Sequence, residues 1–205
     1  MNRSELKSKA KESLKGKYGK STKLFLLYIL VCFGISIVIS FISEFIEINE
    51  LLALILSIIS MFVVYGLYPG FYNFFLKISR NEEVSSNELF KHKNLFLVTI
   101  GATLLAGIFS FLGSLLFIIP GIIVSLNYSM IYFVIIDNPE ISVMDVLRKS
   151  KQIMRGHRID FIILNLSFLG WYILSYFTFG ILLIWIAPYI MVTMANFYNG
   201  IKEYN

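Results

Sequence analysis

The sequence has few of the residues that build catalytic and metal-binding sites. Its only cysteine, Cys32, can form neither an internal disulfide nor a CxxC metal site. Its two histidines, His92 and His157, lie in basic segments without paired carboxylates, and HExxH, GxSxG and phosphate-binding glycine motifs are absent. We therefore expect a protein that is not an enzyme and has no metal site and no cofactor.

Charged residues are also scarce. They make up 15% of the chain and hydrophobic residues 57%, against about 25% and roughly 45–50% in ordinary globular proteins. A soluble domain of 205 residues has too little interior to bury this much apolar surface. The composition therefore predicts an integral membrane protein, in which lipid covers the apolar side chains.

Long hydrophobic runs predict six transmembrane helices. A spanning helix needs about 20 apolar residues, and the runs are Leu24–Ile46, Leu51–Leu76, Leu95–Ile136, Ile159–Phe177 and Ile181–Tyr198. The third run is about twice the length of one span and contains no charge, so it must fold back on itself. Only helices satisfy the backbone hydrogen bonds of such runs inside a bilayer. The predicted fold class is therefore all-α, with six spans arranged as three hairpins.

The turns of two hairpins can be placed from their residues. The middle hairpin turns either at Gly113-Ser114 or at Pro120-Gly121. The second position is favoured, because proline is common in the first turn of a helix. The last hairpin is expected to turn at Thr178-Phe179-Gly180.

The basic residues predict the orientation. All 18 Lys and Arg residues lie before the first run, between the second and third spans, between the fourth and fifth spans, or after the last run. The opposite side carries only Glu44, Glu47 and Glu50. Because basic flanks remain in the cytoplasm, we predict a plasma-membrane protein with both termini inside. Cations beside spans favour anionic lipid headgroups and not nucleic acid as their partner.

The chain is interpreted as one integral membrane domain. Its segments are a basic cytoplasmic N-terminal segment (1–23), hairpin 1 (24–76), a cytoplasmic loop (77–94), hairpin 2 (95–136), a cytoplasmic amphipathic helix (137–158), hairpin 3 (159–198) and a cytoplasmic tail (199–205).

An internal repeat divides this domain into three modules. Residues 81–90 resemble residues 138–147, and each copy contains a capping-box pattern at a predicted helix start, namely Ser85 with Glu88 and Ser142 with Asp145. Residues 4–14 form a looser third copy. Each module is therefore predicted to be a short amphipathic surface helix followed by a hairpin.

The clearest surface helix is predicted between Ser142 and Gly156. At helical spacing its apolar residues share one face and its basic residues the other. Such a helix is expected to lie along the cytoplasmic interface with its cations toward lipid phosphates. The candidate lipid or partner surface consists of Arg148, Lys149, Lys151, Arg155 and Arg158.

Three asparagines, Asn127, Asn165 and Asn196, lie within the predicted spans. They can line a pathway or simply hydrogen-bond neighbouring helices. No ionisable residue lies deep in a span, which argues against a proton-coupled carrier.

Gly66 and Gly70 form a GxxxG pattern that permits close helix packing. Pro69-Gly70 and Pro188 should kink or break their spans.

Three segments resemble a known family of membrane proteins. Leu6–Lys17, Phe117–Ile123 and Ser142–His157 resemble the family called domain of unknown function 975. The resemblance implies a multi-span protein of a Gram-positive bacterium, and it brings no activity, cofactor or functional residue.

The sequence therefore favours a non-enzymatic accessory membrane protein that presents basic cytoplasmic helices to anionic lipid or to a partner, which can be another protein or a second copy of the chain. The alternative is a transporter or channel subunit with a pathway between proline-kinked hairpins.

Overall fold

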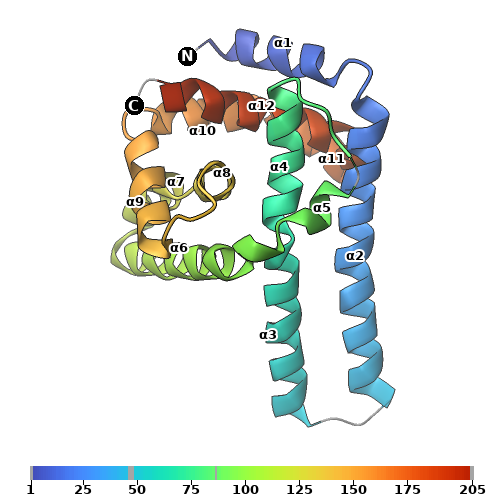
Figure 1. Cartoon of the computed structure of the whole chain (residues 1–205). Helices are drawn as coiled ribbons and strands as arrows, with labels where there is room; N and C mark the ends of the chain where they lie inside the picture. The colour runs from blue at the N-terminus through green and yellow to red at the C-terminus, as the bar shows by residue number, and fades with distance from the viewer. Residues whose placement is uncertain (1, 46–48, 86, 204–205) are drawn as a thin grey trace.

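The computed structural model describes residues 2–45, 49–85 and 87–203, and this part of the chain contains helices and no strand (Figure 1). The helices are α1 (Arg3–Leu14), α2 (Tyr18–Phe45), α3 (Glu50–Gly66), α4 (Tyr68–Ser79), α5 (Glu88–Lys91), η1 (Lys93–Leu95), α6 (Phe96–Leu116), α7 (Ile118–Asn127), α8 (Ile131–Asp137), α9 (Val143–Ile153), α10 (Arg158–Leu166), α11 (Leu169–Phe177) and α12 (Ile181–Glu203). Ile46, the predicted end of the first span, Glu47 of the predicted acidic side, and the end of the predicted tail lie outside these ranges.

Six stretches of the described residues are long and apolar enough to cross a membrane, which confirms the all-α, multi-pass prediction. They are Tyr18–Glu44, Glu50–Ser79, Phe96–Leu116, Ile118–Asp137, Arg158–Phe177 and Ile181–Glu203. Three of them are interrupted, between α3 and α4, α7 and α8, and α10 and α11. Pro69 explains the first interruption, because it lies in the first turn of α4, where its missing N–H costs no hydrogen bond. Pro188 lies inside α12 without breaking it.

The middle turn lies at Phe117, and both predicted positions were wrong. Phe117 has extended backbone between α6 and α7. Gly113 and Ser114 belong to the last turn of α6, whereas Pro120 and Gly121 belong to the first turn of α7. A Cβ added to Gly121 would lie 2.0 Å from Ser114 Oγ, so these residues bring the two helices together beside the turn instead of forming it. The turn at Thr178-Phe179-Gly180 is confirmed, and Gly180 has a φ of 82°.

The helices pack in a cyclic order that repeats three times. Each surface helix packs on the second span of the preceding module: α5 on α4, α9 on α8, and α1 on α12. The first span of each module follows the same rule, since α6 contacts α3 and α4, α10 contacts α7, and α2 contacts α12. The last helix thus packs against the first two, α1 and α2, so the order of helix contacts is cyclic.

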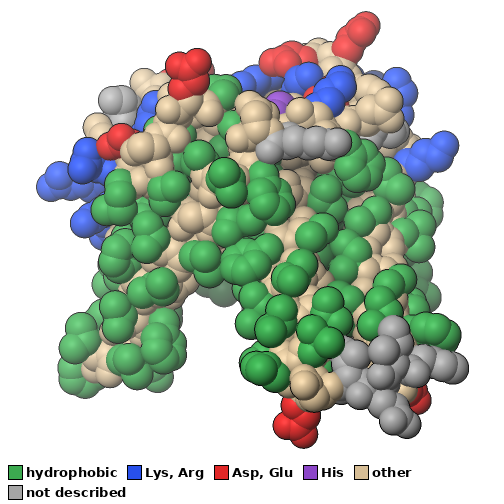
Figure 2. All heavy atoms as spheres, turned by 60° about the horizontal axis from the view of Figure 1, so that its bottom comes forward, with side chains coloured by type: hydrophobic (Ala, Val, Ile, Leu, Met, Phe, Trp, Pro, Cys, Tyr) green, Lys and Arg blue, Asp and Glu red, His purple; other side chains and the backbone are tan. Residues whose placement is uncertain are grey.

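The core lies at one end of this ring, where α4, α8 and α12 meet. Its largest fully buried side chains include Phe74, Phe75, Phe133 and Tyr198, and the rings of Phe133 and Tyr198 stack at 5.0 Å. We call this end, with α1, α5 and α9, the platform. At the other end α2 and α3 extend beyond the remaining helices (Figure 1), and their most apolar windows contain no buried residue. In Figure 2 the projecting lower parts of the molecule are covered by hydrophobic side chains, and the visible Lys and Arg side chains lie toward the opposite end.

The surface helices confirm part of the capping predictions. α9 begins after Ser142, whose Oγ accepts a hydrogen bond from Asp145 N at 3.2 Å, and Gly156 follows its end with a φ of 86°. The predicted cap at Ser85 was wrong, because α5 begins only at Glu88 and has no side-chain cap. Glu88 is turned inward into a buried polar cluster, where it cannot complete a capping box.

Candidate functional site

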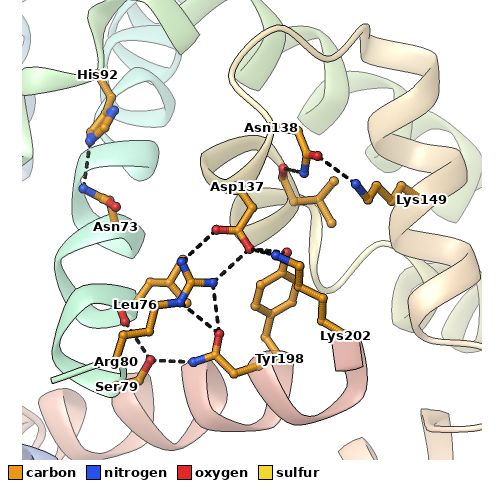
Figure 3. A network of polar contacts seen from close by, with 12 residues as sticks. Asn73, Leu76, Ser79, Arg80, His92, Asp137, Asn138, Lys149, Tyr198 and Lys202 are labelled. Carbon is orange, nitrogen blue, oxygen red and sulfur yellow. Dashed lines mark hydrogen bonds and ion pairs between the residues drawn. The ribbon is translucent and has the colours of Figure 1, made fainter. Parts of the chain in front are cut away.

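Asp137 is the centre of a polar network that joins the ends of three helices on the platform (Figure 3). Arg80, just beyond α4, donates from both terminal nitrogens to the two carboxylate oxygens at 2.9 Å. Lys202 of α12 donates to Oδ2 at 2.7 Å, and Tyr198 donates to the same oxygen at 3.0 Å. The Asp137 side chain is only 7% exposed. One buried carboxylate thus ties the end of α8 to the ends of α4 and α12.

A second layer of amides and hydroxyls extends this network. Asn199 Oδ1 accepts from Arg80 Nε at 3.2 Å, and Asn199 Nδ2 donates to Ser79 Oγ at 2.9 Å. Ser79 Oγ in turn donates to the carbonyl of Leu76 at 2.7 Å. The Asp137 contact raises the pKa of the Arg80 guanidinium. The network therefore holds its ion pair in a fixed orientation at the meeting point of the three modules.

A second buried carboxylate, Glu88, lies between α4 and α5. It accepts from Lys91 Nζ at 2.6 Å and from Asn73 Nδ2 at 3.2 Å, and Lys77 Nζ lies 3.3 Å away. Burial raises the pKa of Glu88, but the hydrogen bond from Lys91 and the charge of Lys77 outweigh burial and lower it overall. Asn73 Nδ2 also lies 2.8 Å from His92 Nε2. Burial, with a smaller contribution from Lys77 and Lys91, lowers the pKa of His92 against the opposing charge of Glu88, which favours the neutral imidazole.

The five predicted cations of the candidate surface differ in their surroundings. Arg148, Lys151 and Arg155 are exposed, and Arg148 pairs with Asp145 at 2.9 Å. Lys149 and Arg158 instead bind amides of the protein, since Lys149 Nζ donates to Asn138 Oδ1 at 2.7 Å and Arg158 Nε donates to Asn127 Oδ1 at 2.8 Å. The structure therefore leaves three of the five on an outward face.

The three predicted intramembrane asparagines have different partners. Asn127 joins α7 to α9 and α10, because its carbonyl also accepts from Ser150 Oγ at 2.8 Å. Asn165 Nδ2 donates within its own helix to the carbonyl of Phe161, and Asn196 Nδ2 donates to the carbonyl of Leu6 in α1. Each of these contacts joins or stabilises helices.

The family described as Protein of unknown function (DUF975) matches this sequence over residues 1–121 and 114–205. The chain belongs to this family. No curated protein and no solved structure matches it.

For this DUF975 member, the sequence reasoning missed the two buried carboxylates. The sequence places Asp137 after a hydrophobic run, at the start of the segment predicted to be a cytoplasmic amphipathic helix (137–158), and it predicts that Glu88 completes a capping box. A signal for the first was present in the repeat. Arg80 and Asp137 directly precede the two repeat copies, at Asn81 and Asn138, so equivalent positions of two modules carry opposite charges.

The platform of this family member also carries exposed cations on α1 and at the start of α2. They are Arg3, Lys9, Lys11, Lys15, Lys20 and Lys23. Lys7 is different, since its Nζ donates to the carbonyl of Ser167 at 3.0 Å and lies 4.2 Å from the ring centre of Phe168. It fastens α1 to the interruption between α10 and α11. The platform thus carries exposed cations on α1 and α9, and buried polar contacts join its helices.

Proposed function

We propose that this chain is a non-enzymatic accessory protein of the plasma membrane of a Gram-positive bacterium, whose platform faces the cytoplasm and binds anionic lipid headgroups. Its six spans would form three hairpins, and α1, α5 and α9 would be cytoplasmic surface helices. The observation that carries the proposal is the outward position of Arg148 and Lys151 on α9, and of Arg155 in the turn just beyond it, because the rest of the protein holds α9 in place.

The packing of α9 supports a binding role for these cations. Its apolar residues Val146, Leu147 and Ile153 are buried against the protein and are not available to anchor it in a bilayer. The backbone that carries these cations is therefore already held in place, which reduces the conformational entropy lost when a phosphate binds. Arginine can hold a phosphate through two hydrogen bonds, whereas lysine offers a point charge.

The transporter alternative receives less support from the packing. Aromatic side chains fill the space where α4, α8 and α12 meet. Tyr72 lies 4.7 Å from Tyr132 and 5.1 Å from Phe133, between ring centres, and Phe133 in turn stacks on Tyr198. A transport pathway through the centre of the helix arrangement would require these aromatic side chains to separate.

The orientation can be tested with single cysteines in a Cys32→Ala background. A cysteine at Asn49, on the side that carries Glu44 and Glu50, is expected to react with an impermeant thiol reagent added outside intact cells. One at Ser85, beside Ser86 (which lies outside the described residues), is expected to react only after the cells are opened, because the positive-inside rule keeps this segment in the cytoplasm. Labelling of Ser85 and not Asn49 in intact cells would contradict the orientation.

Lipid binding can be tested by replacing Arg148, Lys151 and Arg155 together with glutamine. Each cation near an anionic leaflet contributes about 1 kcal/mol at low ionic strength, and Asp145 offsets part of this at Arg148. We therefore expect at least about a tenfold loss of anionic lipid, measured as the phosphatidylglycerol to phosphatidylcholine ratio that copurifies in polymer nanodiscs.

The matched control removes the same charge elsewhere on the platform. Lys11, Lys15 and Lys20 are replaced with glutamine, and this triple variant should lose less phosphatidylglycerol than the α9 variant. Equal retention by the α9 variant and the unmodified protein, with insertion intact, would contradict the proposed role. An equal loss in both triple variants would also contradict it, since α9 would then be only part of a general basic surface.

A further inference from the structure

The second module has a cavity where the third has a packed helix. α9 has 11 residues and α5, its counterpart in the repeat, has 4. At the equivalent place in the third module, Ser150 of α9 and Arg158 of α10 both donate to Asn127 at the end of α7, each at 2.8 Å, so the space is filled. The short α5 leaves a space of about 500 Å³ between itself, the α3–α4 junction and the start of α6, a size typical of a ligand site.

The walls of this cavity are apolar and reach the lipid-facing surface. Val63 of α3, Phe90 of α5 and Leu97 of α6 line it, and they are 42%, 46% and 77% exposed. Both Val63 and Leu97 belong to membrane-spanning stretches. Hydrocarbon from the bilayer can therefore enter the cavity from the side, and an acyl chain is the occupant that this lining favours.

Polar groups line another part of the same cavity. His92 and Asn94 are among its lining residues. His92 Nε2 lies 2.8 Å from Asn73 Nδ2, and an amide nitrogen can only donate. Nε2 is therefore the acceptor, and the neutral ring carries its hydrogen on Nδ1. The Nδ1–H group is a donor of fixed tautomer, suited to an anionic oxygen.

The charged residues around His92 also favour an anionic ligand. Lys77 and Lys91 flank the single carboxylate of Glu88 at 3.3 and 2.6 Å, so the cluster has one cation in excess. A phosphodiester would meet a net positive charge and an N–H donor next to an apolar space. These features together match the junction between the headgroup and the chains of a phospholipid.

We propose that this cavity binds one glycerophospholipid, with an acyl chain along Val63 and Leu97 and the phosphate at His92 Nδ1–H. The site goes beyond the platform surface of α9, because it lies on α3, α5 and α6 and takes a whole lipid molecule. A headgroup alone or a chain alone satisfies only half of it.

The test measures lipid binding to the delipidated full-length protein by native mass spectrometry. The probes are dioleoyl phosphatidylglycerol, dioleoylglycerol with the same chains but no phosphate, and inorganic phosphate. We expect the cavity to bind one phosphatidylglycerol per chain, besides any held by Arg148, Lys151 and Arg155, and binding of each partial probe to the cavity weaker by about tenfold or more, because each lacks one set of contacts. If dioleoylglycerol or inorganic phosphate binds as tightly as phosphatidylglycerol, the proposal is overturned.

A pair of substitutions at His92 tests the donor. His92→Gln places an amide near the position of Nε2, where it can still meet Asn73, but it removes the Nδ1–H group. His92→Asn keeps an amide near Nδ1. We expect His92→Gln to weaken phosphatidylglycerol binding by about tenfold with dioleoylglycerol unchanged, and His92→Asn to weaken it less. Equal binding by His92→Gln and the unmodified protein contradicts the assignment of the phosphate.

Substitutions that narrow the cavity test whether it binds an acyl chain. Val63→Phe and Leu97→Trp should each weaken phosphatidylglycerol and dioleoylglycerol alike. Leu97 is exposed, so its variant should fold even if Val63→Phe does not. Unchanged lipid binding in the folded Leu97→Trp variant would contradict the site. The variant with Arg148, Lys151 and Arg155 replaced should bind this one lipid normally, so failure of the platform proposal and failure of this proposal give different results.

Discussion

Replacing Asp137 with alanine is expected to lower the free energy of unfolding in mixed micelles by about 2–4 kcal/mol. The substitution leaves Arg80 and Lys202 facing each other without their shared carboxylate. Removing one partner of a buried ion pair typically costs about 3–5 kcal/mol. We expect slightly less here, because the Arg80 and Lys202 side chains are 33% and 43% exposed and water can solvate part of their charge.

The control for this prediction is Glu5→Ala on α1. Glu5 pairs with Lys9 at 2.9 Å, but both side chains are more than half exposed, so the change should be too small to resolve. A double-mutant cycle with Arg80→Gln separates the pair from other effects. Unfolding is followed as the fraction of denaturing detergent in the mixed micelles is raised. If Asp137→Ala and Glu5→Ala have the same unfolding midpoint, the network does not hold the modules together.

Much of this fold follows from composition and periodicity. The apolar runs predict six spans, and the positions of Ser142, Gly156 and Gly180 follow from local rules of helix capping and turns. These features depend on residues close together in the chain, so one sequence is sufficient to locate them. The six predicted spans agree with the helices found, although α2 begins at Tyr18 and not at Leu24.

The remaining features depend on contacts between modules. Whether Ser85 caps a helix is decided by Glu88, which binds Asn73 of α4 instead of returning to the backbone. The turn at Phe117 is likewise set by the close approach of Gly113 and Gly121 across two helices. Neither outcome can be read from a short window of sequence.

The cyclic order of helix contacts gives a reason for the composition of the Asp137 network. A ring of three identical modules would place like charges together at its centre, which is unfavourable. Here the equivalent positions carry Arg80 in one module and Asp137 in the next, and α12 of the third module supplies Lys202 and Tyr198. Because the repeats differ at these positions, the ends of α4, α8 and α12 carry charges that attract one another. These charges favour one arrangement of the three helices over the others.

Gly70→Ala is expected to destabilise the protein by about 3 kcal/mol, at the upper end of the range for overpacked cores. Gly70 is buried in α4, and a Cβ there would lie 2.3 Å from the carbonyl oxygen of Leu89 and 2.6 Å from that of Glu88. Both atoms belong to the backbone of α5, so the clash cannot be relieved by rotating a side chain. α5 would have to move away from α4, and the contacts of Glu88 with Asn73 and Lys77 would be stretched.

Two other glycines provide controls that separate this clash from the general effect of replacing glycine in a helix. At Gly34 an added Cβ meets nothing within 4 Å, so alanine should stabilise α2 by up to about 1 kcal/mol through its higher helix propensity. At Gly66 the added Cβ would lie 2.2 Å from the Phe96 ring, which can rotate aside, so Gly66→Ala should be intermediate. The order of the three unfolding free energies in mixed micelles is the measurement. If Gly70→Ala is as stable as Gly34→Ala, then α4 and α5 are not in the close contact that places Glu88 and His92 beside the cavity.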